Sequence, residues 1–317
     1  MSDQTLRAAV LGASGYTGAE TVRIASLHPQ IDVVAATGNA LAGKRLSDIF
    51  PHLSGPTDLD VVKAEDLDWS GIDVVFGCLP HGTSQDLIET LPASVRVVDL
   101  SSDYRFRDAS VYEAAYGRTH IAPETTKNAV YGLSELYADQ LDGARLVACP
   151  GCYPTAALLA LLPLVSPWVI DAGHIVIDAK SGVSGAGRGL KEGNLFSEAA
   201  EGLHAYGVGT HRHAPEIEQE IQLRSGAEQV ELTFLPHLVP MVRGELVTCH
   251  LRGDVDVIHK TLSDTYADQP FVTVLPLGSP PPDTRHVRGT NNCRIAVFPD
   301  RAKGRVIVFA VLIPLFP

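Results

Sequence analysis

The residues best suited to chemistry in this sequence lie in the motif Cys149-Pro150-Gly151-Cys152-Tyr153-Pro154-Thr155. The motif follows an apolar, strand-like run at 145–148 and precedes a helix-like run at 156–162. We therefore expect Cys152 at the start of a helix, where unpaired N–H groups and the helix dipole favour a thiolate. A thiolate in this position can act as a nucleophile. The spacing alone fits equally well a structural cysteine that packs as a small apolar residue.

A second signal is a glycine-rich turn near the beginning of the chain. A short apolar run at 6–11 predicts a buried strand, and a helical stretch extends from 19 to about 27. Between them, Gly12 permits a tight turn, Gly15 lets the backbone approach a pyrophosphate, and Gly18 allows close packing of helix on strand. The spacing G-x-x-G-x-x-G departs from the usual dinucleotide fingerprint, so an ordinary strand-to-helix turn is the alternative.

The end of the second expected strand, at 31–37, bears on which dinucleotide would bind. NAD sites usually place an acidic residue there to hold the ribose 2′-hydroxyl. This strand ends instead in Thr37-Gly38-Asn39, and Lys44 and Arg45 follow closely. Basic residues suit a 2′-phosphate, so the sequence favours NADP. The alternative is that Lys44 and Arg45 are solvated loop charges.

Composition excludes several classes of function. The chain has 317 residues, 45% hydrophobic and 20% charged, with a formal net charge of −12 and five cysteines. It has no basic block, so no nucleic-acid partner is expected. The longest apolar run, 306–316, is too short to span a bilayer, and the N-terminus lacks the features of a signal peptide. Without a disulfide framework in its cysteine pattern, the chain is expected to be a reduced, cytoplasmic enzyme with no membrane partner.

The pattern of expected strands and helices changes midway along the chain, which predicts two domains. In the first half, strands are expected near 6–11, 31–37, 72–79, 95–100 and 145–149, and helices near 18–27 and 83–91. This alternation predicts the α/β class, with a doubly wound parallel sheet that binds a dinucleotide. In the second half, strands are expected near 174–180, 230–235 and 245–251, and helices near 214–224 and 255–267. We predict a dinucleotide-binding domain at 1–151 and a second, α+β domain of mostly antiparallel sheet at 152–317.

Several motifs, in order along nearly the whole chain, together resemble the N-acetyl-γ-glutamyl-phosphate reductases. These NADP-dependent enzymes of arginine biosynthesis belong to the semialdehyde dehydrogenase superfamily. The matching motifs are Gly12–Gly18, Leu79–Gly82, Asp99–Arg105, Tyr131–Glu135, Pro150–Thr155, Lys180–Arg188, His211–Ile217, Pro236–Pro240 and Arg243-Gly244. The cysteine block and the His-Arg-His block are the most specific of them.

The resemblance implies reduction of an acyl phosphate to an aldehyde with release of phosphate. Cys152 would attack the acyl group to form a thioester, which NADPH would then reduce. The resemblance also implies a homo-oligomer, a dimer or a tetramer, with 152–317 as the catalytic, substrate-binding and dimerisation domain. The cofactor contacts that it implies are Gly12, Ser14, Gly15, Tyr16, Thr17, Gly18, Thr37, Ser184 and Gly185.

Acid–base chemistry and substrate recognition need further side chains. We expect His211 to exchange protons, with His213 as the second choice, unless one histidine only orients the other. Glu216 would fix an imidazole tautomer, bind the substrate, or act simply as an acid of a first helical turn. The expected substrate-binding residues are Arg105, Ser181, Arg188 and Glu216. Both arginines could grip phosphate or carboxylate, or form surface ion pairs. A His-x-His metal site lacks a third ligand pattern, so no metal is expected.

Two departures from the family pattern leave alternatives open. Cys149 stands where the family commonly has Asn, and a C-terminal helix of the family is missing after the last strand, which leaves an apolar tail at 313–317. Other reactions considered are reduction of an N-blocked aminoadipyl phosphate in lysine biosynthesis and the aspartate-semialdehyde dehydrogenase reaction. From a different class, Cys149 and Cys152 form a C-x-x-C pattern that could support thiol–disulfide exchange.

Overall fold

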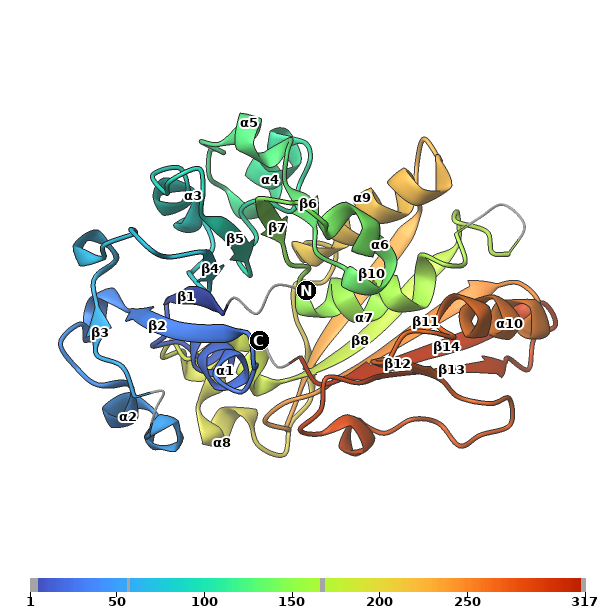
Figure 1. Ribbon diagram of the computed structural model, residues 1–317. Coiled ribbons are helices and arrows are strands. Elements are labelled where there is room, and N and C mark those ends of the chain that lie inside the picture. The colour runs from blue at the N-terminus through green and yellow to red at the C-terminus, as the bar shows by residue number, and fades with distance from the viewer. Residues whose placement is uncertain (1–4, 56–57, 166–168, 315–317) are drawn as a thin grey trace. The chain divides into compact units, whose positions relative to one another are not determined.

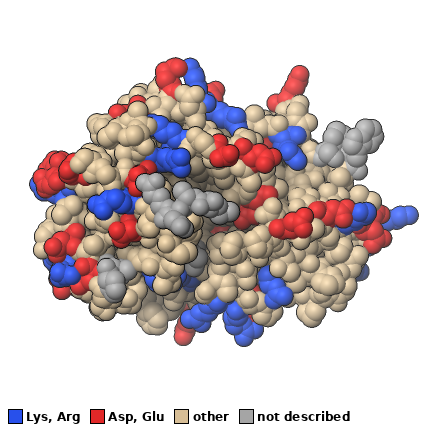
Figure 2. All heavy atoms as spheres, in the orientation of Figure 1, with Lys and Arg blue, Asp and Glu red and all other residues tan. Residues whose placement is uncertain are grey.

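The structure is a computed structural model that describes residues 5–55, 58–165 and 169–314. The chain divides into two compact units, unit 1 (Met1–Pro150) and unit 2 (Gly151–Leu315), and each contains one seven-stranded sheet (Figure 1). Among the described residues, none of the helices has the length and apolar character needed to cross a membrane. On the face drawn in Figure 2, lysine and arginine side chains are interspersed with aspartate and glutamate.

Unit 1 is built on a sheet in which every strand pair is parallel, with the order β3-β2-β1-β4-β5-β7-β6. Its strands are β1 (Leu6–Leu11), β2 (Ile31–Thr37), β3 (Val61–Val62), β4 (Val74–Gly77), β5 (Arg96–Asp99), β6 (Val130–Tyr131) and β7 (Leu146–Ala148). Successive residues of a strand point to opposite faces, so Ala9 and Val10 of β1 belong to different buried clusters. A parallel sheet with a core on each face confirms the predicted doubly wound α/β class.

Short helices connect the strands of unit 1. They are α1 (Tyr16–Ala25), α2 (Leu46–Ile49), α3 (Ser84–Ile88), α4 (Ala109–Tyr116), α5 (Pro123–Thr126) and α6 (Ser134–Leu141). The sequence pattern located α1 and α3 but missed the other four helices, together with the two-residue strands β3 and β6. The two-residue strands and the four-residue helices α2 and α5 carry too few residues to display a hydrophobic period. Helices α4 and α6 have eight residues each but bury only Tyr112 and no residue, respectively, so they present little apolar face.

Unit 2 combines a mixed sheet with long helices. The strand order is β12-β13-β14-β11-β8-β10-β9, and four of its six pairs are antiparallel, while β8–β10 and β12–β13 are parallel. The strands are β8 (Ile175–Gly182), β9 (His204–Ala205), β10 (Leu232–Val239), β11 (Glu245–Arg252), β12 (Val272–Val274), β13 (Cys293–Pro299) and β14 (Arg305–Leu312). The helices are α7 (Cys152–Leu161), α8 (Phe196–Ala199), α9 (His213–Ser225) and α10 (Val255–Thr265). This arrangement confirms the predicted, mostly antiparallel α+β domain.

Helix α7 forms the centre of unit 2. Eight of its ten residues are buried, and it packs against α9, β11 and β14. A helix that is apolar on all sides must be covered on all sides, which fixes its position firmly. The structure therefore holds the start of α7, with Cys152, on a rigid element.

The apolar end of β14 is partly covered. Ile313 is buried and packs with Val287, Val311 and Leu246. The expectation of an apolar tail with nothing to cover it is therefore wrong for Ile313, because the segment around Val287 covers this residue. Residues 315–317 of the predicted tail lie outside the described part of the chain.

Candidate active site

Cys152 is the first residue of α7, as predicted. Gly151 precedes it in an extended conformation (φ −63°, ψ 161°) and is the N-cap residue, without a side chain that could cap the helix. Pro154 lies in the first turn, where its missing N–H costs no hydrogen bond. Cys152 is half-buried and is not part of a disulfide. Cys152 therefore stands at the positive end of a ten-residue helix and is partly accessible.

Glu216 connects the first turn of α9 to the start of α7. Its side chain is fully buried, and the Gly151 N–H donates a hydrogen bond of 2.9 Å to Glu216 Oε1. An N–H at a helix start has no partner within the helix, so Glu216 satisfies a group that would otherwise be stranded. This contact holds the residue directly before Cys152.

His211 and His213 lie together in an aromatic surrounding. Their rings are 4.8 Å apart at an interplanar angle of 73°, and the His213 N–H donates to His211 Nδ1 at 3.2 Å. The rings of Tyr153, Tyr206 and Phe234 lie 5.8, 5.4 and 5.3 Å from that of His211. Because Nδ1 accepts a hydrogen bond, the neutral His211 ring carries its proton on Nε2. Burial, with a smaller contribution from Arg212, lowers the pKa of His211 to about 4. The imidazole is therefore neutral at neutral pH and can donate through Nε2–H.

Two tyrosines fix the walls of this cluster. Tyr206 Oη donates to Tyr153 Oη at 3.1 Å, and Tyr153 Oη donates to the carbonyl of His237 at 3.2 Å. Burial raises the pKa of Tyr206 to about 12 and that of Tyr153 further, so both hydroxyls stay neutral. Sequence analysis did not predict a role for either tyrosine.

Glu245 is a further residue to which sequence analysis gave no role. It is the first residue of β11 and is fully buried, and neither of its carboxyl oxygens has a hydrogen-bond partner among the described residues. Burial raises its pKa to about 8, and the side chains of Cys152 and Ser181 oppose that rise. The available signal was its position: Glu245 alternates with Val247 and Cys249, both buried, so the strand pattern places an acid on an apolar face.

The glycine turn of unit 1 is a tight backbone cradle. Gly12 adopts φ +75°, and a Cβ there would lie 2.4 Å from the carbonyl oxygen of Cys78. A Cβ on Gly18 would lie 2.3 Å from the Gly12 oxygen. The Gly12 N–H donates to Thr37 Oγ1 at 3.3 Å, so Thr37 holds the turn itself. Helix α1 begins at Tyr16 with no side chain capping its first N–H groups, an arrangement that fits a pyrophosphate.

The structure gives two of the predicted arginines other partners. Arg105 is buried, and it donates to the carbonyl oxygens of Cys149 at 2.7 Å and Leu100 at 3.0 Å. Arg45 forms an ion pair with Asp58 at 2.8 Å. Both side chains therefore have partners within unit 1. Arg105 binds the chain just after β5 and β7, and Arg45 binds a loop residue.

The remaining predicted residues follow β8 in unit 2. Ser181 lies near the end of β8, where it is buried and its hydroxyl donates to the Gly182 carbonyl at 3.3 Å. Ser184 and Gly185 lie in a 3-10 segment directly after β8, and Arg188 is exposed just beyond it. Unit 2 thus brings Cys152, Ser181 and Glu216 to its core, with His211 and His213 beside Tyr153.

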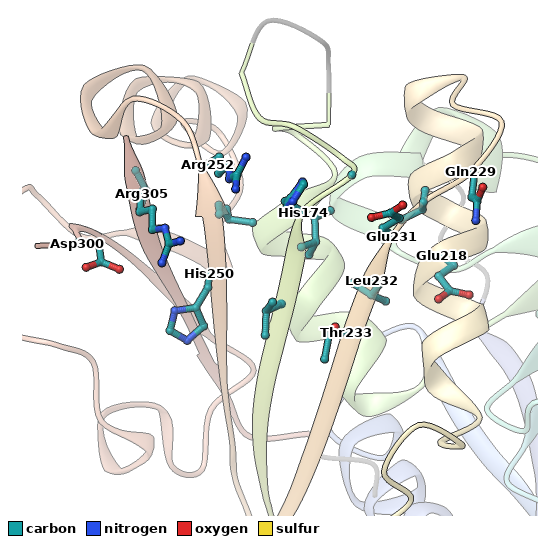
Figure 3. A pocket seen from close by; sticks show the side chains of 16 residues that line it. His174, Glu218, Gln229, Glu231, Leu232, Thr233, His250, Arg252, Asp300 and Arg305 are labelled. Atoms are coloured by element: carbon teal, nitrogen blue, oxygen red, sulfur yellow. The ribbon is translucent and has the colours of Figure 1, made fainter. Parts of the chain in front are cut away.

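A charged hollow elsewhere on unit 2 contrasts with the predicted site, and the arrangement of possible metal ligands adds a second point. A hollow of about 510 Å³ on unit 2 is lined by charged side chains of both signs, including Glu231, Arg252 and Arg305 (Figure 3). It contains none of the predicted catalytic residues. Across the described ranges, no group of three or more His, Cys, Asp or Glu side chains is placed to hold a metal ion.

The sequence matches two family models that together cover most of the chain. Residues 7–144 match the semialdehyde dehydrogenase NAD binding domain, and residues 152–312 match the semialdehyde dehydrogenase dimerisation domain. Aspartate semialdehyde dehydrogenase II from Vibrio cholerae has the same fold, with a TM-score of 0.74 and 14% identity over 99% of this chain and 94% of that chain. The chain therefore belongs to the semialdehyde dehydrogenase family.

Within this family, the chain is similar along almost its whole length to proteins named N-acetyl-γ-glutamyl-phosphate reductase. The protein of that name from Rhodospirillum rubrum is 51% identical over 97% of this chain and 90% of its own length. A probable chloroplastic N-acetyl-γ-glutamyl-phosphate reductase from Arabidopsis thaliana is 46% identical over 98% of this chain and 78% of its own. These relatives confirm the predicted family and favour none of the alternative reactions.

Proposed function

We propose that this chain reduces N-acetyl-γ-glutamyl phosphate to N-acetylglutamate 5-semialdehyde, with NADPH as the reductant and release of phosphate. The proposal depends on the position of Cys152, which is half-buried at the start of α7. It directly follows Gly151, whose N–H is hydrogen-bonded to Glu216. The names of the similar proteins supply the substrate. In this proposal, unit 1 binds the dinucleotide, and unit 2 provides the nucleophile and the substrate site.

The chemistry follows from the position of Cys152. Its thiolate attacks the acyl carbon, so that a C–S bond forms, the C–O bond to phosphate breaks, and phosphate leaves with the electron pair. When bound, the dinucleotide would supply the hydride needed to reduce this thioester. The C–S bond of the reduced adduct then breaks, which releases the aldehyde and returns sulfur as a thiolate. Negative charge grows on the acyl oxygen in both stages.

His211 stabilises that oxygen in the proposed mechanism. A neutral imidazole with its proton on Nε2 is a hydrogen-bond donor, and its neighbours Tyr153 and Phe234 keep it in place. Its low pKa makes it a weak proton acceptor at neutral pH. The proposal therefore assigns His211 to charge stabilisation and His213 to holding His211. The exposed Arg188 is the candidate for binding substrate carboxylate or phosphate.

A coupled assay on the purified chain tests the reaction. Reduction of NADP⁺ that requires both N-acetylglutamate semialdehyde and phosphate would support it. Cys152→Ser should abolish turnover and leave NADPH binding intact, because a hydroxyl is a far weaker nucleophile. Cys149→Asn is the matched control and should keep most activity. Turnover that persists in Cys152→Ser, or that is lost only in Cys149→Asn, would contradict the assignment.

NADP, rather than NAD, is the proposed dinucleotide. Strand β2 ends at Thr37 and is followed by Gly38 and Asn39, without an acid, and Lys44 is exposed nearby, although Arg45 is paired with Asp58. A charge-assisted hydrogen bond to the 2′-phosphate contributes about 1.5–3 kcal/mol, which predicts at least tenfold higher kcat/KM with NADPH than with NADH. Lys44→Gln should reduce that ratio. Equal values for the two dinucleotides would refute the preference.

A homo-oligomer is also part of the proposal. On the sheet face opposite α7, Val176, His250 and Ile307 stand side by side in register, and Val176 is 41% exposed. This partly exposed row, in a region that matches a dimerisation domain, is the proposed contact with a second copy. Val176→Asp should shift the protein towards monomer in sedimentation analysis. A cytoplasmic location remains a prediction from the sequence.

A further inference from the structure

The residues from the end of β4 to the first residue of α3, 78–84, lie beside the glycine turn of unit 1. At the start of this β4–α3 loop, the Cys78 N–H donates to the Leu11 carbonyl at 2.9 Å, and a Cβ on Gly12 would lie 2.4 Å from the Cys78 oxygen. Strands β1 and β4 are neighbours, while the strands that follow them, β2 and β5, lie on opposite sides. Doubly wound sheets bind ligands outside the carboxyl ends of their strands at such a reversal. The β4–α3 loop therefore borders the dinucleotide site proposed for unit 1.

Asp103, in the segment that follows β5, holds this loop through its side chain. The carboxyl group of Asp103 is fully buried. The Gly82 N–H donates to Asp103 Oδ1 at 2.7 Å, and the Ser84 N–H donates to Oδ2 at 3.1 Å. The Ser84 hydroxyl also donates to Oδ2, at 3.0 Å. Because each carboxyl oxygen accepts a different backbone N–H, the pair of contacts fixes both the position and the orientation of the β4–α3 loop.

Further hydrogen bonds hold Asp103 in place. Tyr112 Oη, on α4, donates to Asp103 Oδ1 at 3.1 Å, and the Asp103 N–H donates to Ser101 Oγ at 3.1 Å. The carbonyl oxygen of Asp103 accepts a hydrogen bond from His120 Nε2 at 2.8 Å. Contacts at its backbone and at both carboxyl oxygens leave Asp103 little freedom to move. A side chain that positions another segment needs this kind of support.

We propose that Asp103 is a positioning residue for dinucleotide binding, because it holds the β4–α3 loop in the shape that receives the nicotinamide dinucleotide. The proposal deepens the function proposed above and rests on unit 1 being its dinucleotide-binding part. A loop that has its binding shape in only a fraction of the molecules raises the apparent Kd by the inverse of that fraction. Asp103 acts through the backbone of the loop, so its role requires no contact with the dinucleotide.

An amide cannot replace the Asp103 carboxyl group in this role. Asparagine presents one oxygen and one NH2 group, and an NH2 group cannot accept a hydrogen bond from a backbone N–H. In Asp103→Asn, the N–H of either Gly82 or Ser84 would therefore face another donor. A buried donor without an acceptor is costly enough to shift a loop to another shape.

Asp99 provides a matched control in the same network. It is also fully buried, and its Oδ2 accepts from the hydroxyls of Ser101 at 2.6 Å and Ser84 at 3.2 Å, while its Oδ1 accepts from the Ser101 N–H at 3.1 Å. A hydroxyl can turn and accept instead of donating. In Asp99→Asn, the amide oxygen can accept from the Ser101 N–H, and the NH2 group can donate to the two hydroxyls. The same substitution at residue 99 therefore leaves both N–H contacts of Asp103 intact.

Hydrogen exchange of the Gly82 and Ser84 amides, measured by mass spectrometry with fragmentation to single residues, tests the contacts without dinucleotide. We expect both amides to exchange slowly in the native protein. At least one of them should exchange at least about tenfold faster in Asp103→Asn, and both should keep their native rates in Asp99→Asn. Exchange of both amides at the rate of an unprotected chain in the native protein would overturn the proposal, and this measurement needs no variant that must fold.

NADPH binding and steady-state kinetics supply the second test. In a fluorescence titration, Asp103→Asn should raise the Kd for NADPH about ten- to a hundredfold. The KM for NADPH should rise with it, while kcat at saturating NADPH stays within about threefold of the native value. Asp99→Asn should change neither quantity by more than about threefold. A residue that only stabilised the fold would lower the active fraction and leave the Kd unchanged, so that result would refute the role.

The outcomes for Asp103 and for the proposed reaction are separable. Native NADPH affinity in Asp103→Asn, together with turnover that depends on Cys152, would remove the positioning role and leave the proposed function standing. Weaker NADPH binding in Asp103→Asn alone, in a chain that fails the coupled assay, would support the positioning role and remove the proposed function. Equal losses of NADPH affinity in Asp103→Asn and Asp99→Asn would refute the special role of the two backbone contacts.

Discussion

The contact between Glu216 and Gly151 allows a quantitative prediction about the start of α7. Glu216→Ala strands the buried Gly151 N–H, whose hydrogen bond measures 2.9 Å. An unsatisfied buried donor costs about 1–3 kcal/mol, and the one methylene group that is lost costs roughly 0.8 kcal/mol. We expect the free energy of unfolding to fall by about 2–4 kcal/mol. Glu216→Gln keeps an acceptor oxygen and both methylenes, so its loss should stay below about 1 kcal/mol.

Urea unfolding followed by circular dichroism measures this difference. Both variants change the same side chain. The difference between their free energies of unfolding therefore measures the combined contribution of the acceptor oxygen and of the side-chain volume that Glu216→Ala removes. Because Gly151 directly precedes Cys152, Glu216→Ala should also lower kcat more than Glu216→Gln does. Unfolding free energies of the two variants within about 0.5 kcal/mol of each other would refute the idea that this hydrogen bond fixes the start of α7.

Three further predictions concern unit 1 and the second cysteine. Gly18→Ala places a Cβ 2.3 Å from the Gly12 oxygen, so it should destabilise the chain by about 1–3 kcal/mol and weaken NADPH binding in a fluorescence titration. Burial raises the pKa of Asp99 to about 6, above its usual 3.8. The protonated form is therefore favoured in the folded state, and the stability from this group should fall as pH rises from about 4 to 6, by at most about 3 kcal/mol. Asp99→Asn should not show this fall when the free energy of unfolding is measured across the same pH range. Burial raises the pKa of Cys149 to about 12, next to Asp99 and Arg105. A mild oxidant should therefore form no Cys149–Cys152 disulfide, and native and Cys149→Asn enzymes should lose activity at the same rate.

Local patterns in the sequence predicted the parts of this protein that depend on neighbouring residues. The glycine turn, the helix start at Cys152 and the long strands β8, β10 and β11 each follow from short-range spacing, because backbone geometry and alternation act over a few residues. The motifs also predicted the family, which the relatives confirm. Several elements were missed, among them the two-residue strands β3 and β6, since such strands are held by their neighbours in the sheet more than by their own sequence.

The partners of individual side chains depend on tertiary structure. The sequence made Arg105 and Arg45 candidates for binding an anionic ligand, and the fold brings carbonyl oxygens to Arg105 and Asp58 to Arg45. Substrate binding by Arg105 stays a prediction. Glu216 had three possible roles from its sequence position, and the packing of α9 on α7 brings it to Gly151. Glu245 is 93 residues from Cys152 in the sequence, and only the packing of α7 on β11 brings their side chains together. Burial in the folded chain also sets the pKa of Glu245 and of His211, because burial depends on the whole fold and on no single residue.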